Sequence, residues 1–264
     1  MSPIRVVIHG VSGRMGQVAL GAVAGAEGME PVGGVDVVSP VGGQLKVPGS
    51  SAVIPFSTNL DQMLSDVKPD VVVDFTNAEA CVKAFPIMVK HGAHVVIGTS
   101  GIDESNRKEM DRIARQASTG VFIAPNFALG AVVLGHLAKI AAKYFDYVDI
   151  IEAHHETKID APSGTAIALA RDIASVKQFK RNVPAKENLP QTRGGDIGGV
   201  SIHSIRLPGR LAQHQVIFGG LGQTLILEHD TVGRDCYVPG IVLAVREVIN
   251  LKGLVVGLDK LLGL

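Results

Sequence analysis

The first half of this chain alternates apolar segments with segments of helical pattern, and this alternation constrains the fold more than any other feature. Several of the apolar segments are hydrophobic at consecutive positions, which is typical of strands covered on both faces. Such strands, joined by crossover helices, form a parallel sheet. We expect strands at Ile4–Ile8, Val32–Val35, Val71–Phe75, Val95–Ile97 and Val121–Ala124. We expect helices at Arg14–Gly25, Leu60–Asp66, Ala78–His91 and Glu104–Ala117, the last with Asp103 as its N-cap and Gly120 as a stop just past its end.

The pattern changes after Asn126. A helix near Leu129–Tyr144 carries one apolar stripe, formed by Leu129, Val133, Leu137 and Ile140. Further on we expect strands at Val148–Ala153, Val200–Leu207, Gln215–Phe218 and Thr224–His229, a turn at Gly219–Gly222, a helix from Thr165 to about Ser175, a polar surface loop over Ser175–Gly199, a helix at Pro239–Asn250 and a last turn at Leu258–Leu262. The sequence therefore predicts an α/β protein in two domains. A Rossmann-like doubly wound parallel sheet domain covers residues 1–127 with a C-terminal return over 238–264, and an α+β domain with a mixed or antiparallel sheet covers 128–237.

A glycine-rich turn, His9–Gly16, joins the first expected strand to the first expected helix. Gly10 permits the tight turn, Gly13 lets the backbone approach a pyrophosphate, and Gly16 lets helix and strand pack closely. The helix N-terminus adds unpaired N–H groups and the positive end of its dipole. The spacing is G-x-x-G-x-x-G, with Ser12 at the usual second glycine. The turn therefore predicts a dinucleotide-binding site.

Asp36 ends the second expected strand about twenty residues after this turn, where a carboxylate can accept hydrogen bonds from ribose hydroxyls. Val37 and Val38 follow it, rather than Arg or Lys. A carboxylate at the ribose repels a 2′-phosphate unless a cation compensates it. NAD is therefore favoured over NADP, although Arg14 and Lys46 could supply that charge.

Two more turns, Gly98–Gly101 and Ala124–Phe127, follow expected strands. In open α/β sheets, ligands bind outside the carboxyl ends of the strands. We expect these turns to line the nicotinamide half of the site, although each alone could be an ordinary turn.

The densest group of reactive side chains lies in Glu152–Thr165. His154 can donate a proton near neutral pH, and Lys158 can hold an anionic substrate or donate a proton. Pro162–Thr165 opens the next helix and offers N–H groups and hydroxyls to a carboxylate. The segment predicts a small acidic substrate; surface histidines beside a capped helix are the plain alternative. No metal site is expected, because His154 and His155 are adjacent on a strand and point to opposite faces.

Composition narrows the classes of partner. Lys+Arg 25 and Asp+Glu 25 give a net charge of zero, so we expect no nucleic-acid partner. Residues 116–138 carry no charge and could span a bilayer on length alone, but Pro125 interrupts them, so we expect a buried strand and a core helix and no membrane partner. Cys81 and Cys236 form no Cys-x-x-Cys pair, which indicates a reducing compartment, and we expect a cytoplasmic protein.

Taken together, the motifs resemble those of the dihydrodipicolinate reductase (4-hydroxy-tetrahydrodipicolinate reductase) family of lysine and diaminopimelate biosynthesis. They occur in order along nearly the whole chain, at Gly10–Gly16, Asp74–Thr76, Gly98–Gly101, Ala124–Phe127, Glu152–Thr165, Arg193–Gly198 and Phe218–Gln223. The segment H-H-x-x-K-x-D-A-P-S-G-T is highly specific, whereas the glycine turn by itself is not.

The resemblance implies roles for individual residues. His154 would be the general acid–base residue and Lys158 the second proton donor. The dicarboxylate substrate would be bound by His155, Ser163, Gly164 and Thr165. The cofactor, NADH or NADPH, would be held by Gly10, Val11, Ser12, Gly13, Arg14, Met15, Asp36, Gly98, Thr99, Ser100, Ala124, Pro125, Asn126 and Phe127.

The resemblance also implies a homotetramer built through the sheet of the second domain, with the C-terminal helix packed back on the first domain.

The sequence departs from the pattern of the family at two places. Val37 stands where some relatives carry a basic residue, which argues against a strong NADP preference. Glu156 and Thr157 replace more basic residues of some members but touch no catalytic position.

The resemblance implies an NAD(P)H-dependent oxidoreductase that converts 4-hydroxy-tetrahydrodipicolinate to tetrahydrodipicolinate. The alternatives are a non-catalytic NAD(H)-sensing module and another small-acid dehydrogenase. Glu152–Thr165 argues against a sensor, because a sensor needs no proton donor beside a carboxylate site.

Overall fold

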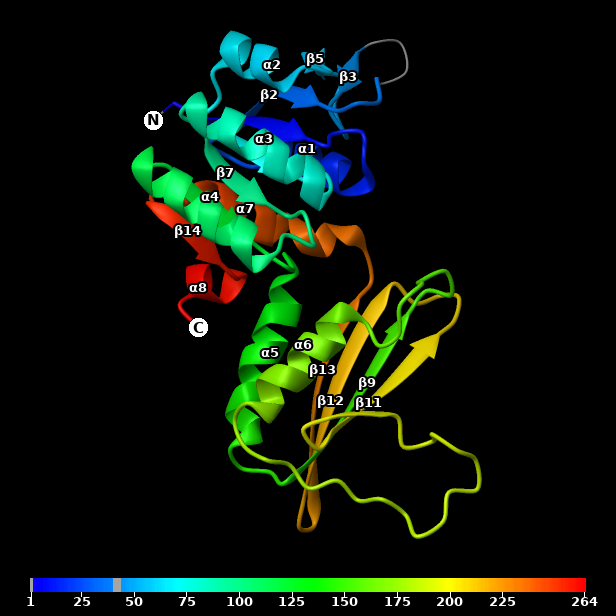
Figure 1. The fold of residues 1–264 in the computed structure, drawn as a ribbon. Coiled ribbons are helices and arrows are strands. Elements are labelled where there is room, and N and C mark those ends of the chain that lie inside the picture. Colours follow the sequence, from blue (N-terminus) through cyan, green and yellow to red (C-terminus); the bar gives the residue numbers. More distant parts are fainter. Residues whose placement is uncertain (1, 40–43) are drawn as a thin grey trace. The chain divides into compact units, whose positions relative to one another are not determined.

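The computed structural model describes residues 2–39 and 44–264 (Figure 1). The chain forms two compact units, Met1–Leu129 with Tyr237–Leu264, and Gly130–Cys236. Each unit has its own sheet and its own hydrophobic core, which is the organisation of two domains.

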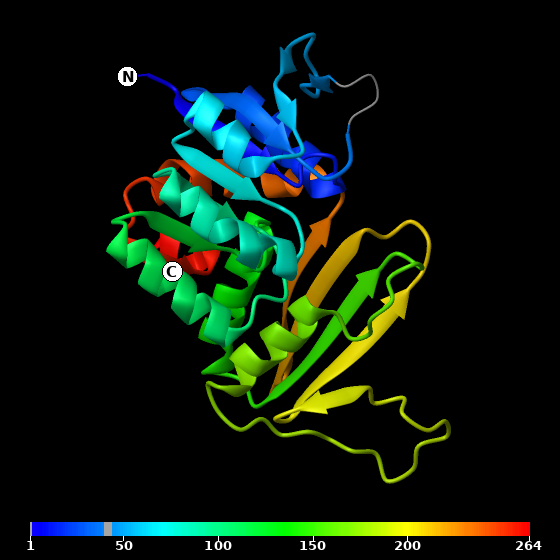
Figure 2. The ribbon, with the colours of Figure 1, turned by 45° about the horizontal axis from the view of Figure 1, so that its top comes forward.

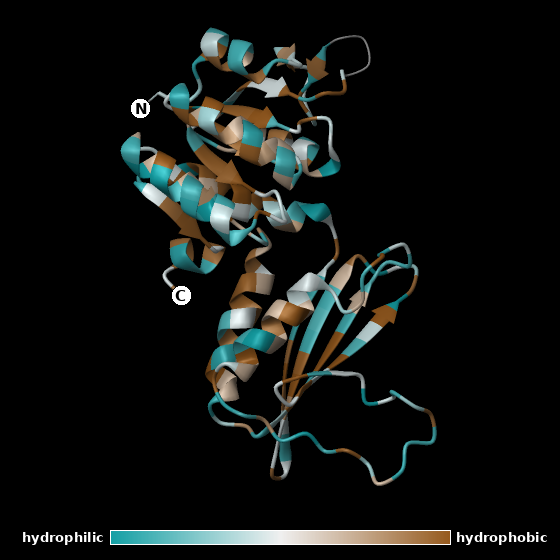
Figure 3. Ribbon diagram, in the orientation of Figure 1, coloured by the Kyte–Doolittle hydropathy of each residue, from teal (hydrophilic) through white to brown (hydrophobic). Residues whose placement is uncertain are grey.

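A seven-stranded sheet forms the centre of the first unit (Figures 1 and 2). Its strands lie in the order β14-β8-β7-β6-β1-β2-β5, and every neighbouring pair is parallel. The strands are β1 (Ile4–His9), β2 (Met29–Val35), β5 (Phe56–Ser57), β6 (Val71–Asp74), β7 (His94–Ile97), β8 (Gly120–Ile123) and β14 (Gly253–Val256). All residues of β6 and β8 are buried, and the central strands are hydrophobic in Figure 3. This burial explains their continuous apolar sequence, since helices cover both faces.

Helices on both faces make the sheet doubly wound. On one face, α1 (Arg14–Gly25) packs against α7 (Val238–Val248), and on the other α3 (Ala78–Lys90) packs against both α2 (Leu60–Val67) and α4 (Glu104–Gln116). The main core lies under the second group, around Phe85, Met88 and Leu64. The predicted Rossmann-like fold is thereby confirmed.

The helix after β7 starts at the predicted residue and ends within one residue of the predicted end. The side chain of Asp103 accepts a hydrogen bond from Asn106 N and caps α4. Its C-cap is Ala117, and Ser118 turns the chain with φ +55°. Gly120 is therefore not a helix stop but the first residue of β8, where a Cβ would collide with the carbonyl oxygen of Val248.

The C-terminal tail adds a strand that the sequence analysis missed. β14 pairs with β8, and α8 (Leu258–Leu262) follows it. The strand is only four residues long, and glycines of positive φ, Gly253 and Gly257, mark its two ends. The short elements β3 (Leu45–Lys46) and β4 (Val53–Ile54), which pair as a hairpin, and the 3₁₀ turn η2 (Arg234–Tyr237) were missed for the same reason, their short length.

The second unit is a five-stranded mixed sheet with two helices on one face. The strand order is β10-β11-β9-β12-β13, with β9 and β11 parallel and the other pairs antiparallel. The elements are α5 (Leu129–Ala142), β9 (Tyr147–His154), α6 (Gly164–Ala174), β10 (Gly195–Ile197), β11 (Val200–Arg206), β12 (Ala212–Gly220) and β13 (Gln223–Thr231). The core between helices and sheet includes Leu134, Ile150 and Phe218. This confirms the expected mixed sheet.

Two local expectations in this unit are corrected. Gly219 and Gly220 belong to β12 rather than to a turn, and the chain reverses at Gly222, which has φ +69°. The expected loop Ser175–Gly199 contains β10, which pairs with β11.

The apolar stripe predicted on α5 is not the face that packs on the sheet. Val133, Leu137 and Ile140 are 40%, 44% and 42% exposed. The buried positions are Leu134, Ala138, Ala141 and Ala142. The helix has apolar residues on two faces, and the three small alanines allow the closer approach to the core.

Candidate active site

The glycine turn after β1 has the close contacts that its sequence predicts. Gly10 has φ +81°, and a Cβ there would lie 2.6 Å from the carbonyl oxygen of Phe75. A Cβ on Gly16 would overlap the carbonyl oxygen of Gly10, so helix α1 packs directly on the turn. Gly13 is the N-cap of α1 and has no side chain to occupy the first N–H groups of the helix. By contrast, Asn59, Asn77 and Asp103 cap α2, α3 and α4 with side-chain oxygens.

Asp36 directly follows β2 and is held beside this turn. Its Oδ2 accepts a hydrogen bond from the backbone N–H of Ser12 at 2.9 Å, and its Oδ1 accepts one from Val38 N at 3.3 Å. Ser12 Oγ donates to the carbonyl oxygen of Val38 at 2.8 Å. The side chain of Val37 is 88% exposed. The carboxylate is therefore fixed at the turn.

A buried carboxylate, Asp74, joins the carboxyl ends of three neighbouring strands. In the sheet register, His9 of β1 and Ile97 of β7 flank Asp74 of β6. Asp74 Oδ2 is 2.6 Å from Nδ1 of His9, and Asp74 Oδ1 accepts from Oγ1 of Thr99 at 2.5 Å and from Oγ1 of Thr76 at 3.0 Å. Burial alone would raise the pKa of Asp74, but these hydrogen bonds outweigh it and lower the pKa.

The two other predicted turns lie at this same edge of the sheet. Gly98 follows β7, and a Cβ there would overlap the ring of Phe75. The ring of Phe127 lies 5.6 Å from that of Phe75, and Asn126 Oδ1 accepts from Ala128 N at 2.9 Å. The turns Gly98–Ser100 and Ala124–Phe127 thus both approach the ring of Phe75. Sequence reasoning missed His9 and Asp74 as a pair, because only the register of β1 and β6 brings them together.

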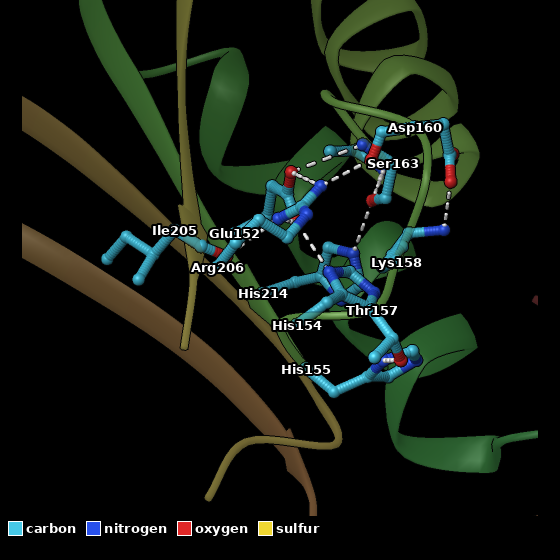
Figure 4. Close-up of polar contacts among 11 residues, drawn as sticks. Glu152, His154, His155, Thr157, Lys158, Asp160, Ser163, Ile205, Arg206 and His214 are labelled. Atoms are coloured by element: carbon cyan, nitrogen blue, oxygen red, sulfur yellow. Dashed lines mark hydrogen bonds and ion pairs between the residues drawn. The ribbon is translucent and has the colours of Figure 1, made fainter. Parts of the chain in front are cut away.

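In the second unit, a cluster of charged and polar groups surrounds Glu152 of β9 (Figure 4). Glu152 is fully buried. Both its oxygens accept from Arg206 of β11, Oε1 at 2.8 Å and Oε2 at 3.0 Å. Oε1 also accepts from the backbone N–H of Ser163 at 3.2 Å. Burial would raise the pKa of Glu152, but the hydrogen bonds of Arg206 and His154 outweigh it and lower the pKa.

His154 stands two residues further along β9, and its Nδ1 is 2.5 Å from Oε2 of Glu152. The residue is 8% exposed. Burial lowers the pKa of His154, and the nearby charges of Lys158 and Arg206 lower it further. Glu152 acts in the opposite direction and raises it. The ring therefore has one nitrogen held by a carboxylate, in the arrangement of a general acid–base pair.

Lys158 and His155 lie in the turn after β9, with other partners (Figure 4). Lys158 Nζ donates to Oδ1 of Asp160 at 2.6 Å, and Lys158 N donates to the carbonyl oxygen of His155 at 3.1 Å. His155 Nδ1 lies 2.7 Å from Oγ1 of Thr157. Lys158 is thus an ion-paired, half-buried cation on the turn that also carries His154 and His155.

Ser163 connects the start of α6 to a second buried histidine. Its Oγ accepts from Ala166 N at 3.1 Å, which caps the helix, and lies 3.2 Å from Nε2 of His214 on β12. The rings of His154 and His214 are 5.4 Å apart, edge to face. Burial and the neighbouring His154 lower the pKa of His214 to about 4. Gly164, exposed, and Thr165, half-buried, follow as the first residues of α6.

Three residues of this cluster, Glu152, Arg206 and His214, were not among the predicted site residues. Glu152 lies in the segment that the motif covers, but Arg206 is 54 residues away and His214 is 51 residues from Ser163. The register of β12 with β9 brings His214 to the cluster, because His214 lies directly opposite Glu152 in the sheet.

The described residues lack two features. Within residues 2–39 and 44–264, no group of three or more His, Cys, Asp or Glu side chains could hold a metal ion. In the same part of the chain, no helix is long and apolar enough to cross a membrane.

A Rossmann-like unit with a glycine turn and a carboxylate at the end of its second strand is typical of a nicotinamide-nucleotide-dependent oxidoreductase. The same chain carries a buried histidine held by a carboxylate, which suits proton transfer. Family models narrow this class: residues 4–127 match the N-terminus of dihydrodipicolinate reductase and residues 130–262 match its C-terminus. The chain belongs to the dihydrodipicolinate reductase family, as its motifs predict.

Individual relatives agree with this assignment. The 4-hydroxy-tetrahydrodipicolinate reductase of Dehalococcoides mccartyi strain 195 is 45% identical, with 100% of both chains covered, and that of Syntrophomonas wolfei is 42% identical over 98% of both. A dipicolinate-bound dihydrodipicolinate reductase from Paenisporosarcina sp. TG-14 matches with a TM-score of 0.87 and 38% identity, covering 98% of this chain and 99% of that one. An amine dehydrogenase from Mycobacterium smegmatis, at 15% identity and a TM-score of 0.68, shares the fold.

Proposed function

We propose that this protein reduces 4-hydroxy-tetrahydrodipicolinate to tetrahydrodipicolinate in lysine and diaminopimelate biosynthesis. The reaction takes up one hydride and one proton and releases one water. The observation that carries the proposal is the buried pair of His154 and Glu152 beside the start of α6, because it combines a proton donor with a site for a carboxylate.

The residues of the first unit fit a nicotinamide dinucleotide. The uncapped start of α1 leaves N–H groups for a pyrophosphate, and Asp36 stands beside them for the ribose. We assign the cofactor to Gly10–Met15, Asp36, Gly98–Ser100 and Ala124–Phe127. The cofactor supplies the hydride when bound. Asp36, followed by the exposed Val37, supports NADH as a cofactor at least as good as NADPH.

The proton comes from His154. Glu152 holds its Nδ1, so Nε2 is the nitrogen that can give a proton to the substrate. Lys158 would serve as the second donor and as a cation that binds the substrate. Its ion pair with Asp160 holds its ammonium group at the turn that follows His154. We assign no step to a metal ion.

The dicarboxylate would be bound by His155, Ser163, Gly164 and Thr165. Two of these, Ser163 and Gly164, bring the N-terminal N–H groups of α6 together with a hydroxyl. The dipicolinate bound to the Paenisporosarcina relative, itself a planar dicarboxylate, supports this class of ligand.

We further propose a cytoplasmic homotetramer. On the sheet face opposite α5 and α6, Ile205 and Ile226 are 42% and 53% exposed, which suits an interface between copies. Both cysteines, Cys81 and Cys236, are free, which fits a reducing compartment. Light scattering after size-exclusion chromatography would measure the mass of the assembly, and a monomer would contradict the tetramer.

One assay tests the proposed activity. The proposed substrate is generated in the cuvette from pyruvate and aspartate semialdehyde by the synthase that makes it. The loss of NADH or NADPH absorbance is followed after this protein is added. Oxidation that requires both the synthase and this protein supports the proposal. Tight NADH binding without turnover would instead indicate the sensing module.

A further inference from the structure

The carboxylate of Glu152 has a fixed orientation. Its Oε1 faces Arg206 Nη2 and the N–H of Ser163, and its Oε2 faces Arg206 Nη1 and Nδ1 of His154. Four contacts on two oxygens hold the carboxylate in this orientation.

Arg206 is itself held in place by the backbone. Its Nη2 donates to the carbonyl oxygen of Asp160 at 2.7 Å, and its Nη1 donates to the carbonyl oxygen of Ile205 at 2.7 Å. The bidentate ion pair keeps Glu152 ionised in a buried place. An ionised carboxylate only accepts hydrogen bonds, so Nδ1 of His154 must carry the hydrogen between them.

We infer that Glu152 is a positioning residue that, held by Arg206, fixes the tautomer and ring orientation of His154 so that Nε2 is the reactive nitrogen. The inference rests on the proposed function for the role of His154, but the tautomer itself does not depend on it. Glu152 touches neither substrate nor cofactor in this scheme and acts only through His154.

The charges around His154 predict how its titration depends on Glu152. Glu152 faces the ring from the same strand, Arg206 from β11, His214 from β12 and Lys158 from the following turn. Of these, Glu152 is the negative charge, and it favours the protonated ring. Loss of that charge disfavours protonation, so a step that needs protonated His154 fails at a lower pH.

Glu152→Gln tests the inference by kinetics. We expect kcat to fall at least about tenfold, as when the carboxylate that orients a catalytic histidine is replaced by an amide. The alkaline limb of the kcat–pH profile should move to lower pH. The KM for the substrate and the Kd for NADH should stay within about twofold.

A spectroscopic readout tests the tautomer without any turnover. In protein labelled with ¹⁵N at histidine, the signal that disappears in His154→Gln is assigned to His154. We expect the wild-type signal to show a hydrogen on Nδ1, and the Glu152→Gln signal to show a shift toward the Nε2–H form.

Asp149→Asn is the matched control. Asp149 is also on β9 and also accepts from an arginine and a histidine, Arg193 at 2.9 Å and His203 at 3.2 Å, but its side chain is on the other face of the sheet. The control removes the same charge from the same strand, and it should leave the alkaline limb and the His154 signal unchanged.

Glu152→Gln leaves the guanidinium of Arg206 without its carboxylate, which could prevent folding. The double variant Glu152→Gln with Arg206→Met removes both charges, so it tests the role of Glu152 without leaving an unpaired guanidinium. It should fold, and it should still lack the fixed Nδ1–H tautomer.

The outcomes separate the two proposals. If the wild-type protein oxidises neither NADH nor NADPH with the synthase product, the proposed function is wrong. The ¹⁵N signal would still show which tautomer His154 adopts. An active Glu152→Gln enzyme with the wild-type profile and the wild-type tautomer overturns the positioning role and leaves the proposed function standing.

Discussion

The backbone N–H of Ser12 donates a 2.9 Å hydrogen bond to Oδ2 of Asp36. This bond joins the turn that would face the pyrophosphate to the carboxylate that would face the ribose. Asp36 orders the turn, and at the same place it would provide the acceptor for ribose hydroxyls.

The first prediction concerns the choice of cofactor. NADH should bind at least as well as NADPH, and Asp36→Ala should weaken NADH more than NADPH, because it removes a ribose acceptor and a repulsive charge together. Titration of both nucleotides measures the dissociation constants. Arg14→Ala is the control for a compensating cation and should affect NADPH more than NADH. A tenfold preference of the wild type for NADPH, about 1.4 kcal/mol, would contradict the prediction.

The second prediction compares two glycines of α1. Gly16→Ala places a Cβ against the carbonyl oxygen of Gly10, so it should cost about 1–3 kcal/mol of unfolding free energy and weaken NADH binding. Gly25→Ala, in the same helix, meets nothing within 4 Å and should stabilise the protein by about 0.5 kcal/mol. Urea unfolding and NADH titration on both variants measure these effects. Equal behaviour of the two variants would exclude close packing as the reason for Gly16.

The sequence predicts the first unit well because its signals are local. Continuous apolar runs such as Val71–Val73 are buried on both faces. The caps Asn77 and Asp103 accept hydrogen bonds from backbone N–H groups three residues further on. The sequence did not show which face of α5 packs on the sheet, because the helix is apolar on two faces. Periodicity alone does not decide whether the face with Val133 or the face with Leu134 is buried.

The candidate site was predictable only where it is contiguous in sequence. His154, Lys158 and Ser163 lie in one motif, and the structure brings His154 and Ser163 to the same carboxylate. Arg206 and His214 come from other strands, and only the register of β9 with β11 and β12 places them there. Isolated charged residues in strands give no sequence signal of their partners.

A third prediction follows from the buried Asp74. Its lowered pKa means that its ionised form stabilises the fold above the unfolded-state pKa of about 3.9, and that this contribution is lost as the pH falls through the lower folded-state pKa. Asp74→Asn should therefore cost about 1–3 kcal/mol of unfolding free energy at neutral pH and progressively less in acid. Urea unfolding at a series of pH values measures the difference.

The control for Asp74 is another aspartate–histidine pair of the same unit. Asp61 Oδ1 lies 2.7 Å from Nε2 of His91, but the carboxylate is exposed. Asp61→Asn should change the stability much less at every pH, because solvent screens the pair. A larger loss for Asp61→Asn than for Asp74→Asn would contradict the importance of burial.

The fourth prediction separates substrate binding from turnover. Lys158→Ala should raise KM and lower kcat, because it removes a cation that would bind the dicarboxylate and serve as a second donor. His155→Ala should act mainly on KM, since its ring is paired with Thr157 and not with the Glu152 cluster. Steady-state kinetics with the coupled assay measure both. A His155→Ala enzyme with unchanged KM and reduced kcat would reverse the assignment.

The last prediction concerns the proton donor. Hydride addition to a conjugated imine places negative charge on the substrate, and a protonated group must neutralise it. Burial, Lys158 and Arg206 outweigh the effect of Glu152 and lower the pKa of His154, so its protonated ring gives up a proton readily. His154→Gln should lower kcat by roughly 10²–10⁴-fold, the usual contribution of general acid–base catalysis. NADH binding should hardly change, because the assigned cofactor residues all belong to the first unit.

His203→Gln is the matched control. His203 is a histidine on β11 that is paired with Asp149 at 3.2 Å rather than with Glu152, so the variant should keep kcat. Near-normal kcat in His154→Gln would remove His154 as the donor and leave Lys158 as the candidate.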